Sequence, residues 1–207
     1  LNDVSVTLDP FNFDINVKTI GTDLIYRNKI VEIETIKSKI SLRSFFSDNF
    51  SLTEISISTK SLVIKDLITF IKLLNNDPKL FIAEKFIKKG YLIADLKLEF
   101  DESGNVIENY KFNGLIKDGK VDLFKKYELN KIDFIFEINE KDLRFFDIKI
   151  MLNNNNILIP ELLASKKNNE YIISGNLNTK DISLTKNEIN NYINNDFVNL
   201  DIQEISF

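Results

Sequence analysis

The feature that most constrains this chain is a long alternation of apolar and polar residues with period two. Its clearest stretch covers residues 92–100, where the apolar positions are Leu92, Ala94, Leu96, Leu98 and Phe100. A period of two places successive side chains on opposite sides, which is typical of a β-strand with one buried face. The turn-forming residues 101–105 follow, and Tyr110, Phe112 and Ile116 then resume the apolar face. The pattern therefore predicts a long hairpin.

The same design returns elsewhere along the chain. Residues 132–138 alternate, a turn is expected at 139–141, and a second hairpin strand follows. Its predicted apolar face is Phe146, Ile148, Ile150 and Leu152. Near the N-terminus, alternation predicts a strand that runs up to Gly21 and carries Phe11, Phe13, Ile15 and Val17. Residues 24–26, 30–36 and 52–58 continue the series of strands.

Three segments change to a helical period. Asp66 is expected to cap a helix whose apolar residues recur at positions 67, 70, 71 and 74. Asp77 and Pro78 begin a second helix, which we expect to end at Gly90. Thr185 and Glu188 form a capping box before a third short helix, and a closing strand is expected over 197–207.

These elements predict a mainly β fold with a few short helices (α+β), in which long antiparallel strands form a curled, groove-like or sandwich-like sheet. Residues 1–77 form an N-terminal β unit ending in a short helix, and residues 78–207 form a second short helix followed by a long antiparallel meander. We expect one continuous module that is a fragment of a larger protein.

Three short helices cannot cover so many long strands. The apolar face must therefore be closed by a second sheet, by strong curling, or by something that is not protein. An ordinary sandwich core is the alternative that the pattern leaves open. The inward positions that we expect to face a lipid, if the face is open, are Leu96, Leu98, Phe100, Phe112, Phe134, Phe136, Ile148 and Ile150.

Composition narrows the chemistry. The 207 residues include no Cys and no His, which excludes thiolate or imidazole zinc sites, Cys-His and Ser-His catalysis, and disulfides. The acid pairs Glu32/Glu34 and Asp101/Glu102 fit solvated strand and turn positions better than a metal or acid-base site. We therefore expect no catalytic residues, no metal and no cofactor. The net charge of −4 argues against a nucleic-acid partner.

Several stretches together resemble the AsmA-like family of bacterial envelope proteins, the group that includes the TamB and YhdP branches. The stretches that carry the resemblance are residues 21–26 (GTDLIY), 40–46 (ISLRSFF), 50–57 (FSLTEISI), 61–64 (SLVI), 94–105 (ADLKLEFDESGN) and 172–177 (IISGNL). Many family members have a proline where Thr59 and Lys60 stand here. That departure leaves the branch of the family open.

The resemblance implies a periplasmic module, anchored in the inner membrane by a segment outside this sequence. It also implies a curled β groove whose apolar concave face shields phospholipid acyl chains, in lipid transport between membranes or in outer-membrane assembly. Other envelope proteins are the implied partners, and the family contributes no catalytic residues. Two alternatives remain: a closed β domain that acts as a structural or protein-interaction unit without a lipid, and a hydrolase that uses only carboxylates.

Overall fold

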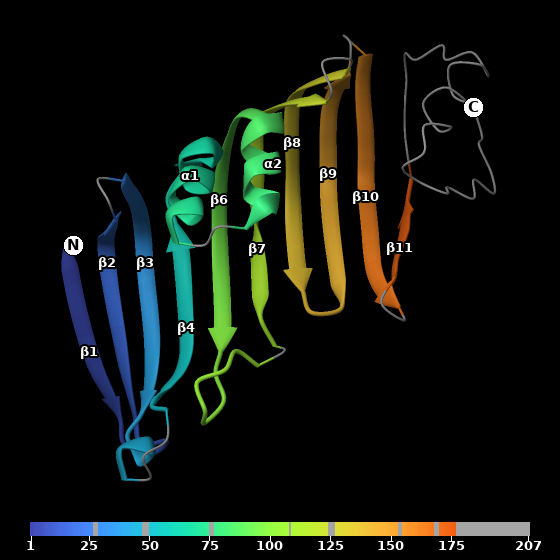
Figure 1. Ribbon diagram of the computed structural model, residues 1–207. Coiled ribbons are helices and arrows are strands. Elements are labelled where there is room, and N and C mark those ends of the chain that lie inside the picture. The colour runs from blue at the N-terminus through green and yellow to red at the C-terminus, as the bar shows by residue number, and fades with distance from the viewer. Residues whose placement is uncertain are drawn as a thin grey trace.

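The computed structural model describes residues 1–26, 29–46, 50–74, 77–107, 109–123, 127–152, 155–167 and 170–176. These residues form a single antiparallel sheet of 11 strands with two α-helices on one side (Figure 1). The sheet is curled and is not closed. The predicted fold class, mainly β with long antiparallel strands and a few short helices, is confirmed.

The strands follow one another across the sheet almost in chain order. The order is β1-β2-β3-β4-β6-β7-β8-β9-β10-β11, and the short strand β5 pairs with β6. In the N-terminal half the strands are β1 (Asp3–Asp9), β2 (Asp14–Tyr26), β3 (Lys29–Ser41), β4 (Leu52–Thr59) and β5 (Leu62–Val63). In the C-terminal half they are β6 (Ile87–Glu99), β7 (Lys111–Leu123), β8 (Tyr127–Asn139), β9 (Asp142–Leu152), β10 (Asn155–Lys167) and β11 (Glu170–Gly175).

The helices are inserted between β4 and β6, which are neighbours in the sheet. Helix α1 (Ile64–Leu74) follows β5 directly, and α2 (Pro78–Phe86) leads into β6. Ile55 of β4 lies opposite Leu98 of β6, so the sheet continues without a break past the helical insertion. A short 3-10 helix, Arg43–Phe46, follows β3.

The start of α2 was predicted correctly, but its end was not. Asp77 is the N-cap and accepts a hydrogen bond from the backbone N–H of Lys79, and Pro78 occupies the first turn. The helix ends at Phe86 rather than at Gly90, because Ile87 adopts an extended backbone and pairs with Val121. Cross-strand pairing decides this boundary, and the local helical pattern does not contain that information.

The N-terminal strand prediction was also partly wrong. Phe11 and Phe13 lie in the turn between β1 and β2, and Phe11 is almost fully exposed. The carboxylate of Asp9 accepts hydrogen bonds from the backbone N–H groups of Phe11 and Asn12, which is a side-chain arrangement that favours a turn. Alternation therefore continues by chance through four residues that reverse the chain.

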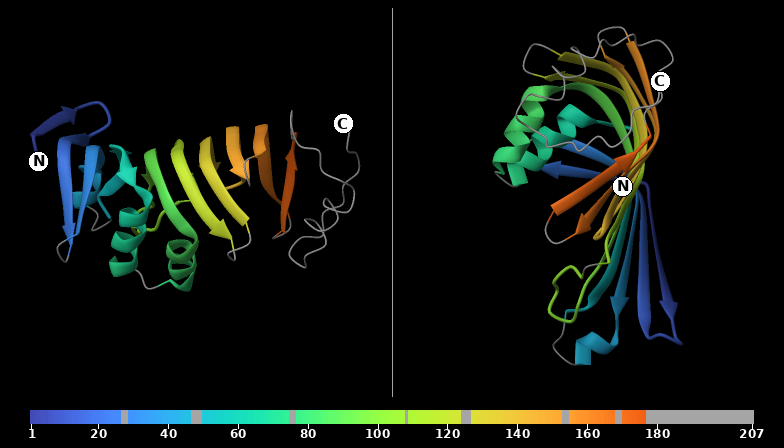
Figure 2. Two further views of the ribbon diagram at one scale, coloured as in Figure 1. Left: turned by 90° about the horizontal axis from the view of Figure 1, so that it is seen from above. Right: turned by 90° about the vertical axis from the view of Figure 1, so that its right-hand side faces the viewer.

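A line of irregular positions bends the sheet. Register shifts occur between β6 and β7, β7 and β8, and β8 and β9. Near these shifts Asp118, Lys131 and Asp147 have φ angles of 50°, 49° and 50°. An extra residue in one strand increases local twist and bends it. Figure 2 shows the resulting curvature, with both helices on the concave side of the sheet.

The irregularity in β9 changes the predicted face of one residue. Phe145 pairs with Phe136, whereas Phe146 pairs with Ile135 on the opposite side of the sheet. The extra residue Asp147 then restores Ile148 to the same side as Phe145. Phe146 was therefore wrongly placed among the inward residues, because a shift of one residue exchanges the two faces of a strand.

The expected third helix at 185–193 and the closing strand at 197–207 lie outside the described residues. In the part of the chain that is described, no helix has the length and apolarity needed to cross a membrane.

The left-handed backbone at Lys131 generates a stability prediction. A side chain with a Cβ atom is strained at this φ angle, and glycine is not. We expect Lys131→Gly to raise the free energy of unfolding by about 0.5 kcal/mol. This gain is the relief of backbone strain less the entropic cost of glycine. Urea denaturation measures it. Lys131→Ala is the control, because it removes the same side chain and keeps the Cβ atom. An equal gain in both variants would contradict the strain explanation.

Candidate functional site: the apolar inner face

One face of the sheet, called here the inner face, is the side on which α1 and α2 lie. Directly opposite residues of antiparallel strands share a face, so the strand register can be followed from edge to edge. One continuous row crosses all ten strands of the main path, and every member except Thr19 is apolar. The row is Val4, Thr19, Ile36, Ile57, Leu96, Phe112, Ile138, Leu143, Ala164 and Ile173.

The opposite side, called the outer face, carries the charged side chains of the central strands. Lys97 forms an ion pair with Glu54 at 3.0 Å across β6 and β4, and Lys117 forms one with Asp133 at 2.8 Å across β7 and β8. Both pairs occupy positions that alternate with inner-face residues. The sheet therefore separates ionic contacts on one side from apolar side chains on the other.

All eight residues predicted to face a lipid lie on the inner face. Leu96 pairs with Phe112, and Phe134 and Phe136 pair with Ile116 and Gly114 of β7. The other members lie at the ends of β6 and along β9: Leu98 opposite Ile55, Phe100 beside the ring of Phe50 at 5.8 Å, Ile148 opposite Ile159, and Ile150 opposite Ile157.

The members differ in how much surface they offer. Phe136 is only 3% exposed and Ile148 only 6%, whereas Leu96, Phe112 and Phe134 are half-buried. Phe136 fits closely over Gly114, where a Cβ atom would come within 2.8 Å of its ring. Phe136 and Ile148 are therefore packing residues, and the half-buried members form the accessible part of the face.

Phenylalanine rings form a cluster on β7, β8 and β9. The ring centroids of Phe112 and Phe136 are 4.9 Å apart, those of Phe134 and Phe136 are 6.3 Å apart, and those of Phe134 and Phe145 are 5.8 Å apart. Tilted and edge-on contacts at these distances are favourable for aromatic pairs. Phe145 belongs to this cluster and was missed, because the sequence Phe145-Phe146 does not show which of the two rings points inward.

Helix α1 covers one part of the inner face. Phe70 packs with Val31, Ile33 and Leu62, and Leu67 joins the neighbouring cluster around Leu92. In Figure 1 both helices lie in front of the upper parts of the central strands. Among the described elements, none lies in front of the lower parts of these strands or in front of β9 and β10.

The ends of the row are the most exposed. Val4 on β1 is 49% exposed and Ile173 on β11 is 59% exposed. Across the described residues, no large side chain has less than 2% of its surface accessible. Much of the apolar surface is therefore accessible to solvent. A large exposed apolar surface on a folded chain usually marks a binding site for a ligand or a partner.

The acidic residues considered in the sequence have structural surroundings. Hydrogen bonds from Asn105 and from the backbone N–H of Ser103 lower the pKa of the Asp101 carboxyl, and they hold the turn after β6. Glu32 forms an ion pair with Lys60 at 3.2 Å on the surface. Within the described residues, no group of three acidic side chains is placed to hold a metal ion.

Packing residues and accessible residues should differ in their effect on stability. We expect Phe136→Ala to lower the free energy of unfolding by about 3–5 kcal/mol, the range for a buried aromatic side chain. Phe134→Ala should cost about 1–2 kcal/mol, because part of this ring already contacts water. Urea denaturation measures both values, and equal losses would show that Phe134 is as much a core residue as Phe136.

Comparison of the chain with protein-family models, with curated proteins and with solved structures gave no match. The fold and the inner face therefore rest on the structure itself, and membership of the AsmA-like family stays a prediction.

Proposed function

We propose that this chain is a non-enzymatic lipid-binding module whose inner face shields the acyl chains of phospholipids. The observation that supports this most directly is the apolar row that crosses ten paired strands of a sheet that is not closed. The helices cover only part of that face. The remainder offers apolar side chains at half-buried positions on the concave side of the curved sheet (Figure 2).

The dimensions of the sheet suit a long apolar ligand. Ten strands spaced by about 4.8 Å give a row about 43 Å long, whereas the hydrocarbon region of one membrane leaflet is about 15 Å thick, half of the bilayer's 30 Å. A phospholipid can therefore lie along the row with its acyl chains against protein for their full length. The row could also accommodate several lipids in succession.

The energetics require no specific polar contact. Each methylene removed from water contributes about 0.8 kcal/mol, so about ten methylenes placed on the face contribute about 8 kcal/mol before the entropic costs of binding. The gain is nearly independent of the headgroup and of position along the row. A lipid can accordingly move between adjacent positions without losing most of its binding energy.

The resemblance to AsmA-like proteins supports the biological setting of the proposal. In that setting the module lies in the periplasm of a bacterial envelope, attached to the inner membrane by a segment outside this sequence. Its role is then lipid transport between membranes or outer-membrane assembly, together with other envelope proteins. The other interpretation of the same face is contact with a protein partner, and the experiment below separates the two.

Crosslinking tests the proposal with a control from the same strand. Phe134 lies on the inner face, and its neighbour Ile135 is 45% exposed on the outer face. With benzoylphenylalanine at either position in the full chain, illumination in the presence of phosphatidylethanolamine vesicles should give at least fivefold more lipid adduct at 134 than at 135. Mass spectrometry of the intact chain measures the adduct.

Ile135 is a stringent control because it is apolar, is more exposed than Phe134 and lies on the other face of the same strand. The same comparison applies to Leu96 on the inner face and Lys97 on the outer face of β6. Equal lipid adducts on both faces, or none at 134 and 96, would contradict the proposal. Protein adducts at 134 in cell extracts, without lipid, would favour the protein-interaction interpretation.

A further inference from the structure

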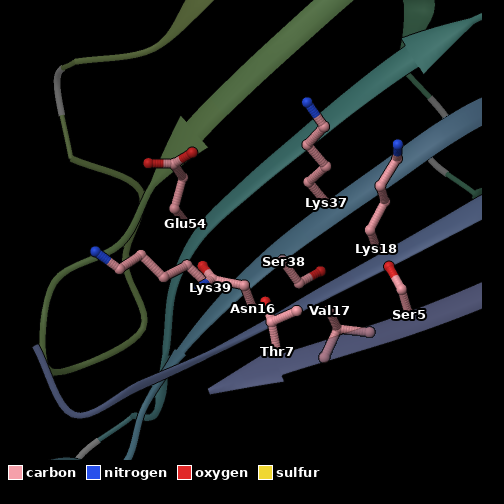
Figure 3. Close-up of a pocket in the computed structure, with 9 residues that line it drawn as sticks. All are labelled: Ser5, Thr7, Asn16, Val17, Lys18, Lys37, Ser38, Lys39 and Glu54. Carbon is pink, nitrogen blue, oxygen red and sulfur yellow. The ribbon is translucent and has the colours of Figure 1, made fainter. Parts of the chain in front are cut away.

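A second surface feature lies on the outer face, away from the apolar row. Strands β1, β2 and β3 border a hollow of about 380 Å³ near the N-terminal edge of the sheet. Figure 3 shows Lys18 and Lys37 side by side over this hollow, with Ser5 beside Lys18. Its lining is mixed, and includes Thr7 and Asn16 together with Val17.

Lysines lie directly opposite one another elsewhere in this sheet, as Lys89 does with Lys120 and Lys97 with Lys111, but those pairs contain lysines that are bound to carboxylates. Lys18 and Lys37 are direct cross-strand partners, and like charges in directly opposite positions are destabilising. Their row continues to Ser5 on β1 and Ser56 on β4. Within the described part of the chain, neither lysine has an ion-pair partner.

Neighbouring lysines are neutralised by carboxylates. One row away, Lys39 forms an ion pair with Asp14 at 2.9 Å, and this contact raises the pKa of Lys39. On β6, Lys97 lies 3.0 Å from Glu54 and 3.0 Å from Glu99. Among the described residues, the row of Lys18 and Lys37 thus leaves two positive charges without a carboxylate partner, whereas the hydroxyl of Ser56 at its far end donates to Glu54 at 3.3 Å.

We propose that this hollow binds a phosphoryl group, held by the ammonium groups of Lys18 and Lys37 and by the hydroxyl of Ser5. Lysine binds phosphate as a compact point charge, and hydroxyl groups donate hydrogen bonds to the remaining oxygens. Glu54 lines the hollow at its other end, where it repels an anion and so favours the side nearer β1. The phosphoryl group can belong to a soluble phosphate compound or to a lipid headgroup.

Two matched double variants of the full chain test the site. Lys18→Gln with Lys37→Gln removes both ligands, and Lys141→Gln with Lys166→Gln removes two exposed lysines that lie together at the other end of the sheet. The two pairs change the net charge equally. At low ionic strength, inorganic phosphate should shift the amide resonances of residues 5, 18 and 37 in the unmodified chain, with acetate as the monovalent control.

We expect the first double variant to weaken phosphate binding at least tenfold and the second to change it less than twofold. Vesicles of phosphatidylcholine with phosphatidic acid form the second arm. Loss of vesicle binding in the first variant alone assigns the site to a headgroup, and phosphate binding without vesicle binding assigns it to a soluble compound. Equal binding of phosphate and vesicles by both variants, or no saturable shift at the three residues and no vesicle binding, overturns the proposal.

A single variant guards against an effect of misfolding. Lys37→Glu places an opposite charge across from Lys18, so its melting temperature should be at least that of the unmodified chain. It should also lose the rise in melting temperature that phosphate gives the unmodified chain. Retention of that rise would overturn the proposal. Crosslinking of lipid at position 134 should be unaffected, which separates this site from the inner face.

Discussion

The register between neighbouring strands is the constraint on which this structure depends. Because opposite residues share a face, the row, apolar except at Thr19, forms only if each of nine successive pairings is in the right register. A slip of one residue in any pairing would move the apolar residues of the next strand to the outer face. The ion pair between Lys97 and Glu54 fixes the same register from the other side, since a slip would separate the charges and place them against apolar neighbours.

Bulges allow the sheet to curve while this register between its strands is kept. A regular sheet with such long strands would be a gently twisted plane, but the irregularities near Asp118, Lys131 and Asp147 bend β7, β8 and β9 toward the helices. Beyond each bulge, the residues that would have pointed inward point outward. The alternation of apolar and polar residues must therefore shift by one residue at the bulge. The change from Phe145 to Ile148 in β9 is such a shift. Curvature and sequence pattern are thus coupled along each strand.

This coupling explains how much could be predicted. Alternation predicts the two long hairpins and the inward position of all eight candidate residues, because it reports directly on the face of a strand. It misplaces Phe146, because the bulge at Asp147 arises in the pairing of β9 with β8. It also extends a strand through Phe11 and Phe13, where hydrogen bonds to Asp9 favour a turn. Which inner residues are buried depends on contacts between strands, such as the close fit of Phe136 over Gly114, so Phe136 and Phe134 looked equivalent in the sequence.

The order of strands across the sheet has a consequence for how the chain folds. Except at the helical insertion, every strand pairs with the strands that precede and follow it in the sequence. Contacts are therefore local, and the entropic cost of closing each new loop is small. The sheet can grow one hairpin at a time, and its stability is close to a sum of neighbour-to-neighbour terms, as in repeat proteins. A defect in one strand should then divide the molecule into separately unfolding segments, with the contact of β4 and β6 as the longest connection that must form.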